Sequence, residues 1–223
     1  LTGLAAAMLF LHARAQNSPA ERPNIIFFLV DDMGWQDTSV PFWTEVTSHN
    51  KEFRTPNMVA LAATAMKFTS AYANSVCTPS RVSLMTGMDA LSHRVTNWTE
   101  FKDQSTDHKD SLLSPPDWNV NGLSPVAGIG RAVYATPFPQ LLKAAGYYTI
   151  QCGKAHFGAY ETPGADPLNI GFVKNIGGSA AGNPASYLAE DDFGYKPDRF
   201  ILQADIPGMK KYWGSSSFLT EDL

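Results

Sequence analysis

The sequence Pro-Asn-Ile-Ile-Phe-Phe-Leu-Val-Asp-Asp occupies residues 23–32 and gives the strongest indication of fold class. Residues 25–30 are apolar at every position, with β-branched and aromatic side chains and no polar alternation. A strand in a parallel sheet is buried on both faces, so it carries a continuous apolar run of this kind. The stretch therefore predicts a buried central strand, with the carboxylates of Asp31 and Asp32 at its carboxyl end.

Helix and strand signals alternate on the C-terminal side of this run. A proline at the first helical position, apolar residues at helical spacing and a glycine after the last turn mark the helices. These signals predict helices at 56–65, 79–85 and 137–145, and strands at 68–73 and 147–152. Residues 100–135 and 161–214 are predicted to be loops. The alternation favours an α/β sandwich around a mostly parallel sheet.

Composition restricts the class of protein. The chain has 223 residues, of which 44% are hydrophobic and 17% charged, as in folded globular domains. The net charge of −4 and the lack of a long basic run argue against a nucleic-acid partner. Two cysteines exclude a disulfide framework. No apolar stretch reaches the roughly 18 residues that a membrane span needs.

The two ends of the chain suggest further sequence on either side. Residues 1–11 are apolar, and Ala13-Arg14-Ala15 follows with small residues at the positions that signal peptidase reads. We therefore expect a partial signal peptide at 1–15, a domain at 16–223 and a secreted or periplasmic protein; a short buried helix is the alternative for the apolar segment. Thr220 and the acidic residues after it predict a helix start at the C-terminus.

Three motifs carry candidate chemistry. The first is Cys77-Thr78-Pro79-Ser80-Arg81, with Pro two and Arg four residues after the cysteine; a buried thiol before a helix is the plain alternative. The second is the adjacent pair Asp31-Asp32, whose mutual repulsion a hard divalent cation would relieve; a solvated turn is its alternative. The third is Gly153-Lys154-Ala155-His156-Phe157-Gly158, which follows a predicted strand.

Together the three motifs resemble the sulfatase family. The resemblance covers residue 23 to the end of the chain and corresponds to the N-terminal part of an alkaline-phosphatase-like catalytic domain. It implies that a formylglycine-generating enzyme oxidises Cys77 to formylglycine, and that further calcium and sulfate ligands lie later in the family's longer chains. This sequence departs from the family pattern at Ala155 and Phe157, where many members carry Trp and Leu, and we expect those changes to affect packing or substrate.

The resemblance also implies roles for individual residues. Calcium would be held by Asp31, Asp32 and the modified residue at position 77. Arg81 would hold the nucleophile or bind sulfate, Lys154 would supply fixed positive charge, and His156 would act as the base that regenerates the aldehyde and releases sulfate. The implied activity is hydrolysis of a sulfate ester on a small molecule or glycan.

Other interpretations remain open at this point. A phosphonate or phosphodiester hydrolase of the same superfamily would use the same nucleophile. A non-catalytic binding fragment, or a truncated product that is inactive alone, is a second alternative. Asn97-Trp98 and Asp117-Trp118 could contact a sugar or could be ordinary loop anchors, and Asn97-Trp98-Thr99 is a glycosylation sequon.

Overall fold

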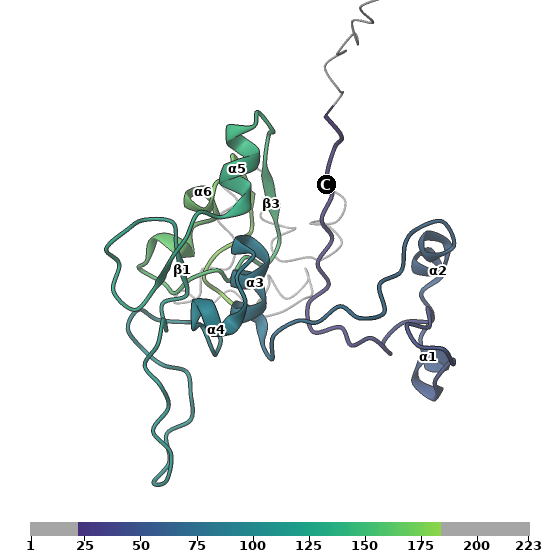
Figure 1. Ribbon diagram of the computed structural model, residues 1–223, viewed down its shortest axis with the longest axis horizontal. Coiled ribbons are helices and arrows are strands. Elements are labelled where there is room, and N and C mark those ends of the chain that lie inside the picture. The colour runs from purple at the N-terminus through teal and green to yellow at the C-terminus, as the bar shows by residue number, and fades with distance from the viewer. Residues whose placement is uncertain (1–21, 184–223) are drawn as a thin grey trace, which may run out of the picture. The chain divides into compact units, whose positions relative to one another are not determined.

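The computed structural model describes residues 22–183 (Figure 1). The predicted signal segment at 1–15 and the predicted helix start at Thr220 lie outside the described residues. The chain divides into two compact units, Leu1–Asp31 and Asp32–Leu223, which are described separately. Within residues 22–183, no helix is both long enough and apolar enough to cross a membrane.

The apolar run of the first unit is not a strand. Residues 22–30 have no regular secondary structure, and the side chains from Ile25 to Val30 are between 46% and 86% exposed. A parallel strand is held by hydrogen bonds to neighbouring strands. Among the described residues, the strand-to-strand hydrogen bonds connect segments later in the chain, and none of them involves residues 22–30. The prediction of a buried central strand at this position is therefore wrong in this structure.

The second unit begins with two short helices. Helix α1 (Ser48–Glu52) starts with a capping box in which Thr47 and Asn50 satisfy each other's backbone amides. Helix α2 (Pro56–Ala62) has proline at its first position, as predicted, but ends three residues early. The hydroxyl of Thr55, the residue before α2, accepts the Ser39 amide at 3.0 Å, so it fixes a turn and caps no helical amide.

Residues 77–176 of the second unit form nine short elements. In chain order they are α3 (Cys77–Thr86), α4 (Ala90–His93), β1 (Leu123–Ser124), β2 (Val133–Tyr134), α5 (Phe138–Ala144), β3 (Ile150–Cys152), η1 (Pro163–Ala165), α6 (Pro167–Ile170) and β4 (Lys174–Ile176). Helices α3 and α4 are in contact and lie side by side in Figure 1. The predicted helices at 79–85 and 137–145 are thus confirmed, and so is part of the strand at 147–152; residues 68–73 form no strand.

Parallel pairing is present, in two separate pairs. Strand β1 pairs with β2, and β3 pairs with β4 with Gln151 opposite Asn175. The α/β class and the parallel strand direction are confirmed. One continuous central sheet is not formed by the described residues, because each ladder is only two or three residues long and joins only two strands.

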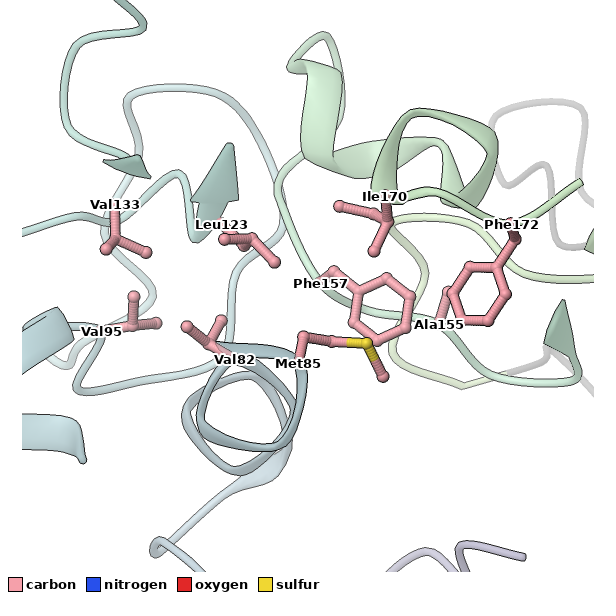
Figure 2. Packing of buried hydrophobic residues seen from close by; sticks show 9 residues of the cluster. All are labelled: Val82, Met85, Val95, Leu123, Val133, Ala155, Phe157, Ile170 and Phe172. Atoms are coloured by element: carbon pink, nitrogen blue, oxygen red, sulfur yellow. The ribbon is translucent and has the colours of Figure 1, made fainter. Parts of the chain in front are cut away.

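One hydrophobic core holds these elements together (Figure 2). Its members come from α3, the start of β1 and β2, α6, and the segments that follow α4, β3 and α6. They are Val82, Met85, Val95, Leu123, Val133, Ala155, Phe157, Ile170 and Phe172. The rings of Phe157 and Phe172 stack with centroids 6.3 Å apart. This packing fixes the segment after β3 against α3.

The chain backbone approaches itself closely at Gly164 in η1. A Cβ atom at this position would lie 1.8 Å from the carbonyl oxygen of Leu123. No side chain can occupy that space unless η1 moves away from β1. At Gly130, by contrast, an added Cβ would meet no atom within 4 Å.

We therefore predict that Gly164→Ala lowers the free energy of unfolding by about 1–3 kcal/mol or more, as overpacked cores do. Gly130→Ala is the matched control and should change stability by less than about 0.5 kcal/mol. Urea unfolding of both variants tests this. Equal stability of the two variants would show that the backbone contact at Leu123 is not rigid.

A hydrogen bond from His93, the last residue of α4, connects this helix to Ser83 of α3. The His93 ring is fully buried; Nδ1 accepts the Val95 amide at 3.0 Å, so Nε2 carries the proton and donates to Ser83 Oγ at 2.9 Å. Burial lowers the pKa of His93, while the Pro79 carbonyl and the Asp89 carboxylate act in the opposite direction. Protonation of Nδ1 would remove the bond to Val95, so the folded protein holds His93 neutral.

This histidine should make folding sensitive to mild acid. As pH falls below about 6.5, the unfolded chain takes up a proton that the folded protein excludes, so the free energy of unfolding falls, with a slope of at most about 1.4 kcal/mol per pH unit. His93→Gln should reduce this slope between pH 6.5 and 5.5. His49→Gln, at an exposed histidine, should leave the slope unchanged. An unchanged slope in His93→Gln would contradict the prediction.

Candidate active site

Cys77 is the first residue of α3. Val76 before it is extended and provides no side-chain cap, but the Ser80 hydroxyl donates to the Val76 carbonyl at 2.9 Å and accepts the Asn74 amide at 3.1 Å. These bonds fix the approach of the chain to the helix. The first amides of a helix have no partners within it and form its positive end. The half-buried Cys77 side chain therefore lies where an anion is stabilised.

Arg81 lies one helical turn after Cys77 and so on the same face of α3. Its side chain is 5% exposed, although it carries a permanent positive charge. Nη1 donates to the carbonyl oxygen of Lys154 at 2.7 Å. This bond joins the Cys77 motif to the Gly-Lys-x-His motif across 73 positions of sequence.

Lys154 and His156 follow the carboxyl end of β3. The Gly153 amide extends the parallel ladder by donating to Ile176, and the chain then turns away from β4. His156 adopts a φ of 51°, and its amide donates to Ser179 at 2.9 Å. Such left-handed backbone is uncommon outside glycine and persists only where the surroundings hold it. The carboxyl ends of parallel strands are the usual edge for binding sites in α/β folds.

Thr99 connects His156 to α3. His156 is 1% exposed, and its Nε2–H donates to the Thr99 carbonyl at 2.7 Å, which leaves Nδ1 as the nitrogen able to accept a proton. The Thr99 amide donates to Thr78 Oγ1 at 3.1 Å, and Thr78 is the residue after Cys77. The sequence offered no signal for this role, because Thr99 is 21 and 57 positions away from its two partners.

The two residues that depart from the family pattern lie in the core. Ala155 is 0% and Phe157 is 1% exposed, and both belong to the hydrophobic cluster of Figure 2. They alternate with Lys154 and His156 along the segment. Both side chains therefore take part in packing, and the expectation that the two substitutions affect packing or substrate stays a prediction.

Asp31 and Asp32 are exposed to solvent, and Asp32 adopts a φ of 55°. Asp31 ends the first unit and Asp32 begins the second. Calcium needs six to eight oxygen ligands. Within residues 22–183, no three Asp, Glu, His or Cys side chains gather to hold a metal ion. The described residues therefore do not form a complete calcium site.

The remaining polar and aromatic candidates from the sequence lie in loops or at a strand end. The Asp117 carboxylate pairs with Arg131 at 2.5 Å, so it serves as a loop anchor. Asn97, Trp98 and Trp118 line one cleft. Cys152 ends β3, as predicted, and like Cys77 it is not in a disulfide.

Known proteins share long stretches of this sequence. The family model "Sulfatase" matches residues 23–203. The chain is 36% identical over 156 residues to N-acetylgalactosamine-6-sulfatase of Sus scrofa, covering 70% of this chain and 25% of that protein. It is 29% identical over 168 residues to an arylsulfatase of Klebsiella aerogenes, covering 75% of this chain and 30% of the relative.

An uncharacterized sulfatase of Schizosaccharomyces pombe is 29% identical over 168 residues, covering 72% of this chain and 25% of the yeast protein. The chain thus spans about a quarter to a third of the length of these relatives. The match to the family model extends over most of the sequence and includes all three motifs. The chain belongs to the sulfatase family.

Proposed function

We propose that the protein containing this chain hydrolyses sulfate esters, with a formylglycine made from Cys77 as nucleophile. The observation that carries the proposal is the hydrogen bond from Arg81 to the Lys154 carbonyl, which brings the two sulfatase motifs together. The second link, from Thr78 through Thr99 to His156, supports the same arrangement. Two motifs that served unrelated structural purposes would not need to meet.

The position of Cys77 suits the modified residue. A formylglycine supplies a hydrated aldehyde, whose two hydroxyls allow sulfate to be taken up and then released. The positive end of α3 favours the anionic form of that group and the sulfate oxygens. The side chain is half-buried, so a substrate can reach it while bulk water is partly excluded.

We assign the neighbouring residues by their chemistry. The Arg81 guanidinium is planar and has five N–H donors, one of which donates to the Lys154 carbonyl. This geometry matches the oxygens of a sulfate or of the nucleophile, so we assign Arg81 to bind one of them. Lys154 adds a second positive charge. His156 is proposed as the base, with its proton accepted at Nδ1 because Nε2–H is fixed on Thr99.

The substrate class and the location are proposed from the same sources. One group of relatives is named N-acetylgalactosamine-6-sulfatase, which supports a sulfated glycan as the substrate here. The apolar segment at 1–11 and the small residues before Gln16 support export, into the medium or the periplasm. A formylglycine-generating enzyme is the protein partner that such a nucleophile requires.

Cys77 should be found as formylglycine when the protein is made in a host that carries the generating enzyme. Trypsin releases residues 68–81 as one peptide, and mass spectrometry distinguishes the aldehyde from the thiol. Cys77→Ala should abolish turnover of p-nitrophenyl sulfate and leave the unfolding transition nearly unchanged. A peptide that stays entirely thiol in a competent host would overturn the nucleophile assignment. Hydrolysis of a phosphodiester in place of the sulfate ester would favour the related hydrolases of the superfamily.

We further propose that Asp31 and Asp32 supply two calcium ligands, with the others provided from beyond residues 22–183. Asp31→Asn and Asp32→Asn in the complete protein should each weaken calcium binding at least about tenfold, because each removes a charged oxygen from a hard cation. Calorimetric titration with calcium measures this, and Glu45→Gln, at an exposed carboxylate, is the control. Full affinity in both aspartate variants would show that calcium binds elsewhere.

A further inference from the structure

The segment that follows β4 contacts His156 at two places. The Ser179 carbonyl accepts the His156 amide at 2.9 Å. Three residues later the backbone of Gly182 lies against the imidazole, because an added Cβ at Gly182 would be only 2.7 Å from Cε1 of that ring. Residues 179–182 therefore contact both the backbone and the ring of the proposed base.

His156 needs such contacts to keep its geometry. Its backbone is left-handed, with a φ of 51°, and its side chain is 1% exposed. A residue that carries a Cβ atom stays in this backbone region only where its surroundings over-determine it. The bond to Ser179 is one of those constraints, and it comes from outside the segment that carries Lys154 and His156. The orientation of His156 therefore depends on where the segment after β4 lies.

Asn175, in the middle of β4, fixes the start of that segment. Its Oδ1 accepts the Gly178 amide at 3.0 Å, and its Nδ2 donates to the Gly178 carbonyl at 2.8 Å. One side chain thus satisfies both backbone groups of a buried residue, which would be costly to leave without hydrogen bonds. The next residue along the chain is Ser179, so the turn that Asn175 closes places the carbonyl that His156 needs.

The closed turn is tightly packed against the segment of the base. A Cβ atom added at Gly178 would lie 2.7 Å from Asn175 Oδ1 and 3.0 Å from the Cβ of Ala155. Ala155 immediately precedes His156 and is 0% exposed. The small side chain of Ala155 leaves the space in which the turn lies, and a movement of the turn would change the contacts of both residues.

The requirements of the strand do not explain an asparagine at position 175. Strand β4 spans Lys174–Ile176, and Asn175 is paired with Gln151 of β3 through backbone atoms. Asparagine is depleted in strands, where β-branched and aromatic side chains are favoured. The two bonds of the Asn175 side chain go to the turn and none of them belongs to the β3–β4 ladder. The side chain therefore serves the turn.

We propose that Asn175 is a positioning residue for His156. It closes the turn at 176–179, and through that turn it sets the Ser179 carbonyl that holds the His156 amide and the Gly182 backbone that lies against the ring. The catalytic consequence rests on the proposed function of His156 as the base. The positioning itself is a property of the fold and is measured without a substrate.

Hydrogen–deuterium exchange of the complete protein tests the positioning. In Asn175→Ala, the His156 amide should exchange about tenfold faster or more, because the turn that carries its acceptor opens more often. The Val173 amide donates to the Thr149 carbonyl at 2.8 Å and reports on the strand pair. Its exchange should stay unchanged. Mass spectrometry with fragmentation resolves the two amides.

The catalytic consequence is tested with p-nitrophenyl sulfate. In the proposed reaction His156 accepts a proton when sulfate is released, after the ester bond has been cleaved. Asn175→Ala should therefore lower the steady-state kcat by about tenfold or more, since small displacements of catalytic groups are costly. The first p-nitrophenol per enzyme should appear as fast as in the unsubstituted protein. A general loss of structure would slow both phases equally.

Two further variants complete the comparison. Asn175→Asp keeps an acceptor for the Gly178 amide but has no donor for its carbonyl, so its exchange and kcat should lie between those of the unsubstituted protein and Asn175→Ala. It also serves as the test variant if Asn175→Ala does not fold. Asn169→Ala is the matched control, because Asn169 is an exposed asparagine whose Nδ2 donates to the Pro163 carbonyl at 3.0 Å. It should change neither measurement.

The outcomes separate the two proposals. The positioning role is wrong if the His156 amide exchanges at the same rate in the Asn175 variants, or if the Val173 amide is accelerated equally. The catalytic consequence is wrong if both kinetic phases slow by the same factor. If the unsubstituted protein hydrolyses no sulfate ester while exchange at His156 responds as expected, the proposed function fails and the positioning role of Asn175 stands.

Discussion

The structure around the proposed site depends on one buried charge. The Arg81 guanidinium is 5% exposed, and an ion in that position is costly unless polar groups replace its lost water. The Lys154 carbonyl, 2.7 Å away, is one such group, and it belongs to the segment that also carries His156. Forming the core around Val82 and Phe157 and satisfying Arg81 are therefore one event: neither α3 nor the turn after β3 can shift without exposing apolar surface and breaking this bond.

Elements with strong local signals could be predicted from the sequence. Helix α3 ends where Gly87 supplies a left-handed residue at φ 71°, and α2 begins where proline has no amide to lose. Helices η1 and α6 and strand β4 lie in a region predicted as loop, because three or four residues are too few to show a period. Thr99 could not be found at all, since its partners are distant in sequence and its bonds use mostly backbone atoms.

The apolar run at 25–30 shows why composition alone misjudged the sheet. A helix satisfies its own backbone, so α3 forms from local sequence and needs neighbours only for its apolar face. A parallel strand depends on partners for every hydrogen bond, and the described residues provide such partners only within the pairs β1–β2 and β3–β4. The apolar pattern indicates that a strand from Ile25 to Val30 would be stable if both of its faces were buried. It carries no information on whether neighbouring strands are present to bury them.

The segment 97–99 has a buried and an exposed side chain in adjacent positions. Thr99 is 2% exposed and bonds inward to Thr78 and His156, while the neighbouring Trp98 is 39% exposed and faces the cleft. Two neighbouring side chains of this short segment therefore lie in opposite surroundings. Any shift of the backbone at Trp98 would move the adjacent Thr99 carbonyl, which accepts the hydrogen bond from His156.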